Sequence, residues 1–226
     1  MRTLLVALLL SPFALAAQTP PETLFNLVHL NAQAEREIPN DLLTATLAAE
    51  AEGADPAQLA DGVNRTMQRA LAAALAYKSV KTQSAGYQTI PVYDKNRVAR
   101  WRVRQEMRLE SADFAAATEL IGKLQATLMV AGMNLAVSGE TRRKAENALI
   151  AEALAAFDER ARVVRDAMKA KGYRVRDLQV STGGAPPRPI PQMARAMSSE
   201  SVAQPAIEPG STRILITVSG TIQLQQ

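Results

Sequence analysis

The sequence predicts an α+β protein in which strand–strand–helix units repeat with an antiparallel sheet, followed by a long third helix and a C-terminal strand. Two observations lead to this prediction. Segments with period-two hydrophobicity are followed by a segment with helical periodicity, and this order occurs twice. Residues 212–225 then alternate regularly between two faces, so we expect this terminal strand to lie in a sheet beside an earlier strand.

The first unit begins with a strand over residues 24–37, whose apolar face includes Val28 and Ala32 and whose polar face includes His29. The turn signal Pro39-Asn40-Asp41 leads into a second strand over residues 42–52. Because the turn is so short, we expect the two strands to form an antiparallel hairpin. A helix follows, with Asp55 as its N-cap and Pro56 in its first turn. Its buried stripe is predicted to contain Leu59, Val63, Met67, Ala70, Leu71 and Ala74.

The second unit repeats this order. Residues 80–93 are mostly extended, Asp94-Lys95-Asn96 is a turn, and residues 98–110 give the clearest strand pattern in the chain. A helix begins near Asp113. The rest of the chain predicts a short strand over residues 132–139, a long helix over 141–171 that ends at Gly172, and a strand over 173–182. Residues 183–210 are rich in proline and predict a loop.

The N-terminus has the pattern of a secretory signal peptide. Arg2 precedes an apolar run over residues 4–10, and Ala14-Leu15-Ala16 has the small residues of a cleavage site. The run is too short to span a bilayer, which takes about 20 apolar residues. We therefore expect cleavage near Ala16 or Ala17, a signal peptide over residues 1–17, one domain over 18–226, and a periplasmic or secreted protein that is not an integral membrane protein.

Export and composition exclude several classes of function. Export removes ATP, NAD and nucleic acid from the ligands to be expected, so we expect none of these as a partner. The chain has no cysteine, which excludes disulfides, thiol catalysis and cysteine-ligated metals. The net charge of +4 falls to +3 once Arg2 is removed and is compatible with an anionic envelope component as a partner.

Several short motifs, in a fixed order over about 190 residues, are similar to those of one known family. They include the Pro39-Asn40-Asp41 turn, the segment Thr89-Ile90-Pro91-Val92-Tyr93-Asp94, and Gly132-Met133-Asn134 before the long helix. Further members of the series are Asn64, Met67 and Leu71 on the first helix, and Arg142, Arg143, Ala145 and Ala148 on the long helix. With these motifs the chain resembles the SIMPL-domain family of bacterial exported proteins. One departure is Arg100-Trp101, where the family often has Gly-Tyr.

The resemblance implies an α+β fold and, since some members look like rings or channels, a tendency to form oligomers. It also implies a link to oxidative-stress defence without an established catalytic site. These implications come from the resemblance and not from the hydrophobic pattern.

No residue pattern predicts a catalytic, cofactor-binding or metal site. His29 is the single histidine, and no nucleophile motif accompanies it. Carboxylates near the ends of the first two strands could converge on a hard cation, although solvated strand ends are the simpler interpretation. These carboxylates are Glu35, Glu37, Asp41, Glu50 and Glu52.

A row of arginines is the candidate interface. Arg100, Arg102, Arg104 and Arg108 share one face of the strand over residues 98–110, with Glu106 and Glu110 in the same row. Residues two apart on a strand lie about 6.6 Å apart, so these guanidinium groups repel one another unless they are matched. The row is either a salt-bridged sheet face, which we favour, or an interface with an acidic surface.

The function predicted from the sequence is a non-catalytic exported binding or assembly module that self-associates and contributes to envelope or oxidative-stress protection. Met193 and Met197 in the proline-rich segment could scavenge oxidants, although loop methionines are common. Two alternatives stay open: an envelope hydrolase or other enzyme with an unrecognised carboxylate site, and a carrier for a small ligand.

Overall fold

The computed structural model describes residues 25–183 and 208–226. The predicted signal peptide and most of the proline-rich segment, with Met193 and Met197, lie outside the described residues. The elements follow the predicted order of strands and helices. They are β1 (Leu27–Pro39), β2 (Leu42–Gly53), α1 (Pro56–Ala74), β3 (Lys81–Asp94), β4 (Arg97–Ser111), α2 (Phe114–Leu124), β5 (Met129–Ala136), α3 (Gly139–Ala167), β6 (Gly172–Gly183) and β7 (Ser211–Gln225).

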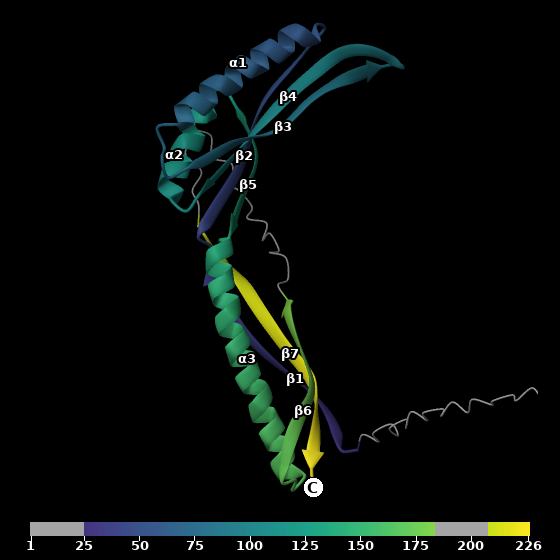
Figure 1. Cartoon of the computed structure of the whole chain (residues 1–226). Coiled ribbons are helices and arrows are strands. Elements are labelled where there is room, and N and C mark those ends of the chain that lie inside the picture. The colour runs from purple at the N-terminus through teal and green to yellow at the C-terminus, as the bar shows by residue number, and fades with distance from the viewer. Residues whose placement is uncertain (1–24, 184–207) are drawn as a thin grey trace, which may run out of the picture.

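The described residues form two lobes placed end to end (Figure 1). The first lobe has a sheet with strand order β3-β4-β2-β5, and α1 and α2 cover one face of it. The second lobe has a sheet with strand order β1-β7-β6, with α3 packed against it. Neighbouring strands are antiparallel in both sheets, so the predicted fold class is confirmed.

The predicted hairpin between the first two strands is wrong. Over its whole length β1 pairs with β7 from the other end of the chain, whereas β2 lies between β4 and β5 in the other sheet. The turn residues connect the lobes instead. The backbone N–H of Asn40 donates to Gly210 at 3.1 Å, and that of Asp41 donates to Ala136 at 3.1 Å, so neighbouring residues bind to different lobes.

Each lobe has its own hydrophobic core. In the first, Leu47 and Met107 from the sheet pack with Met67 of α1 and Ile121 of α2. In the second, Leu149, Ala153 and Phe157 of α3 pack on the buried faces of β1 and β7. The apolar faces of the strands and of α1 were predicted from periodicity, because alternation places every second strand residue on one face.

The helix starts follow local chemistry. Asp55 accepts from the backbone N–H of Ala57 at 2.9 Å, as its N-cap position predicts. The end of α3 differs from the prediction at Gly172, because Lys169 takes a left-handed conformation with φ of 52° and ends the helix earlier. Within the described ranges, no helix combines the length and the apolarity needed to cross a bilayer.

Candidate interaction surface

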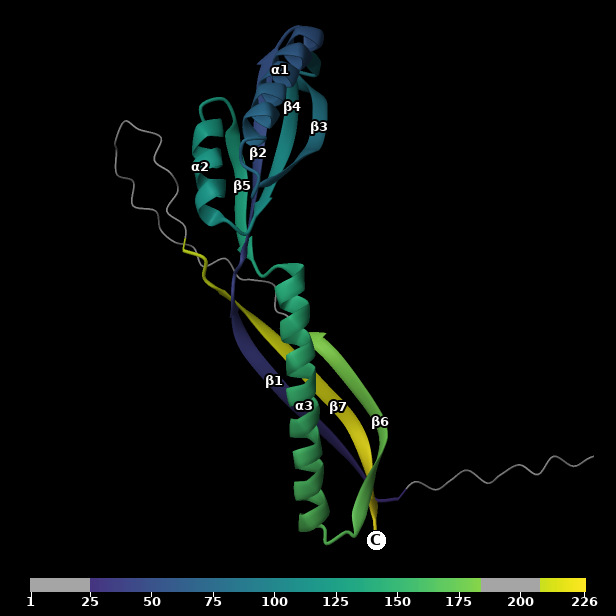
Figure 2. The same ribbon diagram turned by 60° about the vertical axis from the view of Figure 1, so that its left-hand side comes forward.

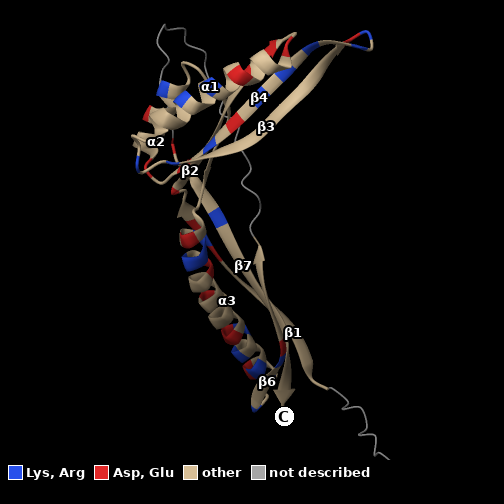
Figure 3. Ribbon diagram, turned by 45° about the horizontal axis from the view of Figure 1, so that its top comes forward, with Lys and Arg blue, Asp and Glu red and all other residues tan. Residues whose placement is uncertain are grey.

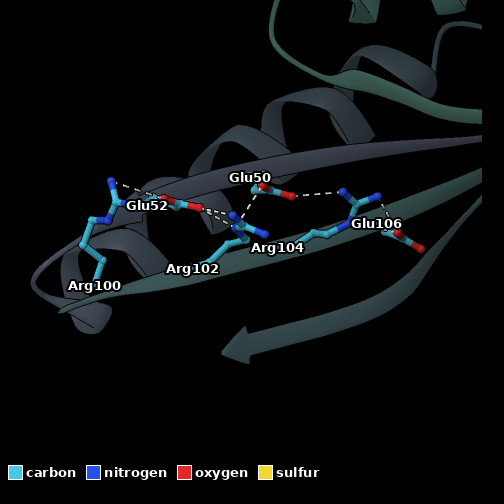
Figure 4. A network of polar contacts seen from close by, with 6 residues as sticks. All are labelled: Glu50, Glu52, Arg100, Arg102, Arg104 and Glu106. Carbon is cyan, nitrogen blue, oxygen red and sulfur yellow. Dashed lines mark hydrogen bonds and ion pairs between the residues drawn. The ribbon is translucent and has the colours of Figure 1, made fainter. Parts of the chain in front are cut away.

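The arginine row lies on the outer face of the first lobe, opposite the face that α1 and α2 cover. In the antiparallel register of β2 and β4, Glu50 lies opposite Arg104 and Glu52 lies opposite Arg102. Figure 4 shows six of the charged side chains in a line along these two strands. The register therefore places acids from β2 beside the arginines of β4.

Every arginine of the row forms an ion pair within the chain. Arg104 Nη1 lies 2.9 Å from Glu50, and its Nη2 lies 2.8 Å from Glu106. Arg102 pairs with Glu52 and lies 3.4 Å from Glu50. Two further pairs are Arg100 with Glu52 at 3.8 Å and Arg108 with Glu110 at 3.0 Å. We call these eight residues the charge ladder: Arg100, Arg102, Arg104, Arg108, Glu50, Glu52, Glu106 and Glu110.

The charge ladder is electrically balanced, since each arginine is offset by a glutamate. Hydrogen bonds from Arg104 to Glu50, and then to Glu106, raise the pKa of this guanidinium above its usual value. The surface pairs remain partly exposed, with 31% of the Arg104 side chain and 60% of the Arg100 side chain accessible. Mutual neutralisation explains how four arginines lie in one row on β4, which is the interpretation that the sequence favoured.

β3 and β4 form a hairpin that continues past Gly53, the last residue of β2, and we call its residues 87–100 the arm; Arg100 belongs both to the arm and to the charge ladder. Figure 1 shows it projecting from the first lobe, away from α2 and from the second lobe. Its tip is a two-residue turn in which Lys95 and Asn96 have φ of 44° and 64°, the conformation that suits a tight hairpin. The predicted turn at this position is thus confirmed.

The arm carries exposed apolar side chains. Tyr93 is 63% exposed, and Tyr87, Ile90 and Val98 are also exposed. β3 has no charged residue between its end residues, Lys81 and Asp94, and Figure 3 shows this length without blue or red. β3 is also an edge strand of its sheet. An uncharged edge with exposed aromatic residues is unusual, because charges normally protect sheet edges from pairing.

The other predicted residues lie in separate places. His29 is exposed on β1, with its Nδ1 3.5 Å from the hydroxyl of Thr221. Glu35 and Glu37 lie near Arg213, and with Arg36 they line an open hollow of about 230 Å³. Glu50 and Glu52 belong to the charge ladder, and Asp41 lies at the junction of the lobes. The five carboxylates therefore do not converge, and no group of three or more potential ligands among the described residues could hold a metal ion.

Sequence reasoning missed the cluster at the junction. Asp41 accepts hydrogen bonds from the backbone N–H of Ser138 at 2.5 Å, from its hydroxyl at 2.9 Å, and from the Thr141 hydroxyl at 2.5 Å. Burial acts to raise the pKa of Asp41, but the hydrogen bonds from Thr141 and Ser138 outweigh it and the pKa is lowered. One signal in the sequence could have indicated this cluster. Ser138 is the N-cap of the long helix α3, and a helix start has free backbone N–H groups that attract acceptors such as a carboxylate.

A family model described as SIMPL, protein of unknown function (DUF541), matches residues 28–222. The chain belongs to the SIMPL family. The match covers both lobes, and it confirms the resemblance drawn from the short motifs. A search of curated proteins found no match to this sequence.

Proposed function

We propose that this SIMPL protein is a non-catalytic module that is exported and self-associates through the arm. The single observation that carries this proposal is the uncharged edge of β3 with Tyr87, Ile90 and Tyr93 exposed along it. Several exposed apolar side chains on a projecting element indicate that a protein partner, rather than solvent, covers them. The family likeness and the N-terminal pattern support a role in protecting the cell envelope, including protection from oxidants.

The charge ladder fits this proposal as a surface that excludes wrong partners rather than one that supplies most of the affinity. Its arginines are already paired, so an acidic neighbour would have to compete with Glu50 and Glu52. A second copy presents the same alternating charges and can exchange pairs without leaving a charge unmatched. Contact between the charge ladders of two copies thus favours self-association over binding of a uniformly anionic polymer.

The two alternative functions have less support from the described residues. The hollow beside Arg213 is lined by Glu35, Arg36 and Glu37, whereas a carrier of a small ligand needs a mostly apolar pocket. An enzyme would need paired acids in one cleft, and the carboxylates singled out from the sequence fall into three separate places, where those of β1 and β2 are matched by arginines.

The test is the mass of the exported protein. Cells express the full chain, and the protein released from the periplasm is measured by size-exclusion chromatography with light scattering over a range of concentrations. We expect a mass of several subunits. The double variant Tyr93→Ser/Val98→Ser should have a lower mass, whereas Leu75→Ser, which replaces an exposed residue beyond α1, should leave the mass unchanged. A single-subunit wild type, or an arm variant with the wild-type mass, would contradict the proposal.

A further inference from the structure

A second apolar surface lies in the other lobe, on the edge strand β6. The register with β7 places Val175 opposite Ile222, Leu178 opposite Gly220 and Val180 opposite Val218. Ile222 and Val218 are fully buried beneath α3, so the β6 residues lie on the same face of the sheet. Yet Val175, Leu178 and Val180 are 45%, 44% and 41% exposed.

The exposure has a simple geometric cause. The buried stripe of α3 packs on β1 and β7, and Figure 2 shows β6 curving away from the helix on the side opposite β1. The three side chains therefore face the helix side of the sheet without reaching the helix. We call them the β6 strip: Val175, Leu178 and Val180.

Each of the other edges of the described sheets has a feature that hinders regular pairing with a further strand. β1 has Glu35, Arg36 and Glu37 in succession, and Arg36 pairs with Glu152 of α3. β3 contains Pro91 and two register shifts, and β5 has 8 residues. By contrast, residues 177–183 of β6 pair with β7 without a shift and contain no proline. Such a segment is suited to accept another strand.

We propose that β6 pairs antiparallel with β6 of a second copy, about a two-fold axis at Gln179. This inference rests on the proposed self-association but uses a surface separate from the arm. In this register Leu178 lies opposite Val180 of the second copy on the helix side of the sheet, and the reverse pair forms at the same time. On the other side, Asp177 lies opposite Ser181 of the second copy, whose hydroxyl can donate to the carboxylate.

The pairing is self-complementary at each position. Apolar residues face apolar residues, Gln179 faces its own copy and can form an amide pair, and no like charges are placed opposite each other over residues 177–181. Two three-stranded sheets would join into one continuous sheet, which satisfies the free backbone groups of both edges. A two-fold contact of this kind closes on itself and leaves the arms free for other contacts.

The absence of native cysteine makes disulfide trapping a clean test. The variant is Gln179→Cys in the full chain, and the matched control is Gln33→Cys, which is exposed on β1 at the opposite edge of the same sheet. Residues that lie opposite each other in an antiparallel pair have Cα atoms about 4.5–5.5 Å apart, within the range of a disulfide. Under mild oxidation, we expect Gln179→Cys to form a covalent dimer at least about tenfold faster than Gln33→Cys.

The register has its own test. When Asp177→Cys and Ser181→Cys are mixed, the disulfide between the two variants should exceed the disulfide of either variant with itself. Adding Leu178→Lys to Gln179→Cys should slow trapping to the rate of the control, since the change places two lysines in the apolar contact. Equal rates for Gln179→Cys and Gln33→Cys would overturn the inference.

Other outcomes separate this inference from the proposed function. If the protein is a multi-subunit assembly whose Gln179→Cys variant is not trapped, the β6 contact is wrong and self-association stands. If adding Tyr93→Ser/Val98→Ser to Gln179→Cys leaves the covalent dimer forming at the same rate, the β6 contact stands without the arm. If trapping appears only after proteolytic cleavage within residues 184–207, that segment and not a second copy occupies the β6 strip, and the inference is overturned.

Discussion

Gly220 lies at the centre of β7, where the docking of β6 depends on the absence of a side chain. A Cβ at this position would lie 2.4 Å from the backbone oxygen of Asp177 and 3.3 Å from the Cα of Leu178. Both are backbone atoms, so the contact cannot be relieved by rotation of a side chain. The close approach coincides with the register shift between Val175 and Asp177, which brings the β6 backbone over the glycine.

The variant Gly220→Ala should therefore displace β6. Overpacking of this kind costs about 1–3 kcal/mol. Gly220 does not have a positive φ, so alanine can adopt its backbone conformation. Alanine also lowers the conformational entropy of the unfolded chain, which stabilises the fold by about 0.4–1 kcal/mol. Gly183→Ala is the matched control, because it lies in the same sheet and its Cβ would meet its nearest atom at 4.0 Å. The difference in free energy of unfolding between the two variants should thus be about 1–3 kcal/mol.

Urea unfolding followed by far-UV circular dichroism measures this difference, and hydrogen exchange locates it. Amides of β6 should exchange faster in Gly220→Ala, whereas amides of β2 and β4 in the other lobe should be unchanged, because the two cores are separate. A difference in unfolding free energy below about 0.5 kcal/mol, with β6 exchange unaltered, would refute the close-approach argument.

Three further predictions concern the rest of the molecule. Met107→Ala should lower the free energy of unfolding by about 2–5 kcal/mol, because Met107 is fully buried, while the exposed Met129→Ala should change it by less than about 0.5 kcal/mol in the same urea titration. Arg104→Ala should cost about 1 kcal/mol in dilute buffer and less in about 1 M NaCl, where salt screens the charge ladder; an equal loss at both salt concentrations would contradict an electrostatic role. Because the Asp41 pKa is lowered on folding, its carboxylate stabilises the fold above the unfolded value of 3.8, and this contribution is lost as the pH falls through the lower folded value. The wild-type melting temperature should therefore exceed that of Asp41→Asn at pH 7, and this difference should shrink below about pH 4. A difference that does not change with pH would refute this linkage.

The sequence predicted the elements well because their signals are local. Alternation in β4 placed Met107 in the core and Arg104 outside it, and Asp55 marked the start of α1. The pairing of β1 failed because its partner lies at the far end of the chain, and no local pattern distinguishes β7 from β2 as a neighbour of β1. A short turn favours a hairpin only when both strands can bury their apolar faces on the same core.

The candidate surface was predictable only in part for the same reason. The sequence indicated that acids had to match the arginines, and it included Glu50 and Glu52 among the candidates. It also grouped them with Glu35 and Glu37, which the β1–β7 pairing carries into the other lobe. Exposure of the arm and of the β6 strip depends on where α1 and α3 stop covering the sheets, and that limit is a property of packing between distant segments.

The separation of the two cores places a mechanical demand on the junction. The arm belongs to one lobe and the β6 strip to the other, so an assembly that used both surfaces would need the lobes held at one angle. Within residues 25–183 and 208–226, two connections cross between the lobes, one at Asn40 and Asp41 and one between Ala136 and Ser138. Asp41 joins them through three hydrogen bonds. Because a charged acceptor strengthens each of these bonds, one carboxylate can restrict both connections at once. Loss of Asp41 would then affect more than its own hydrogen bonds, since the relative directions of the two proposed surfaces depend on the angle that Asp41 helps to set.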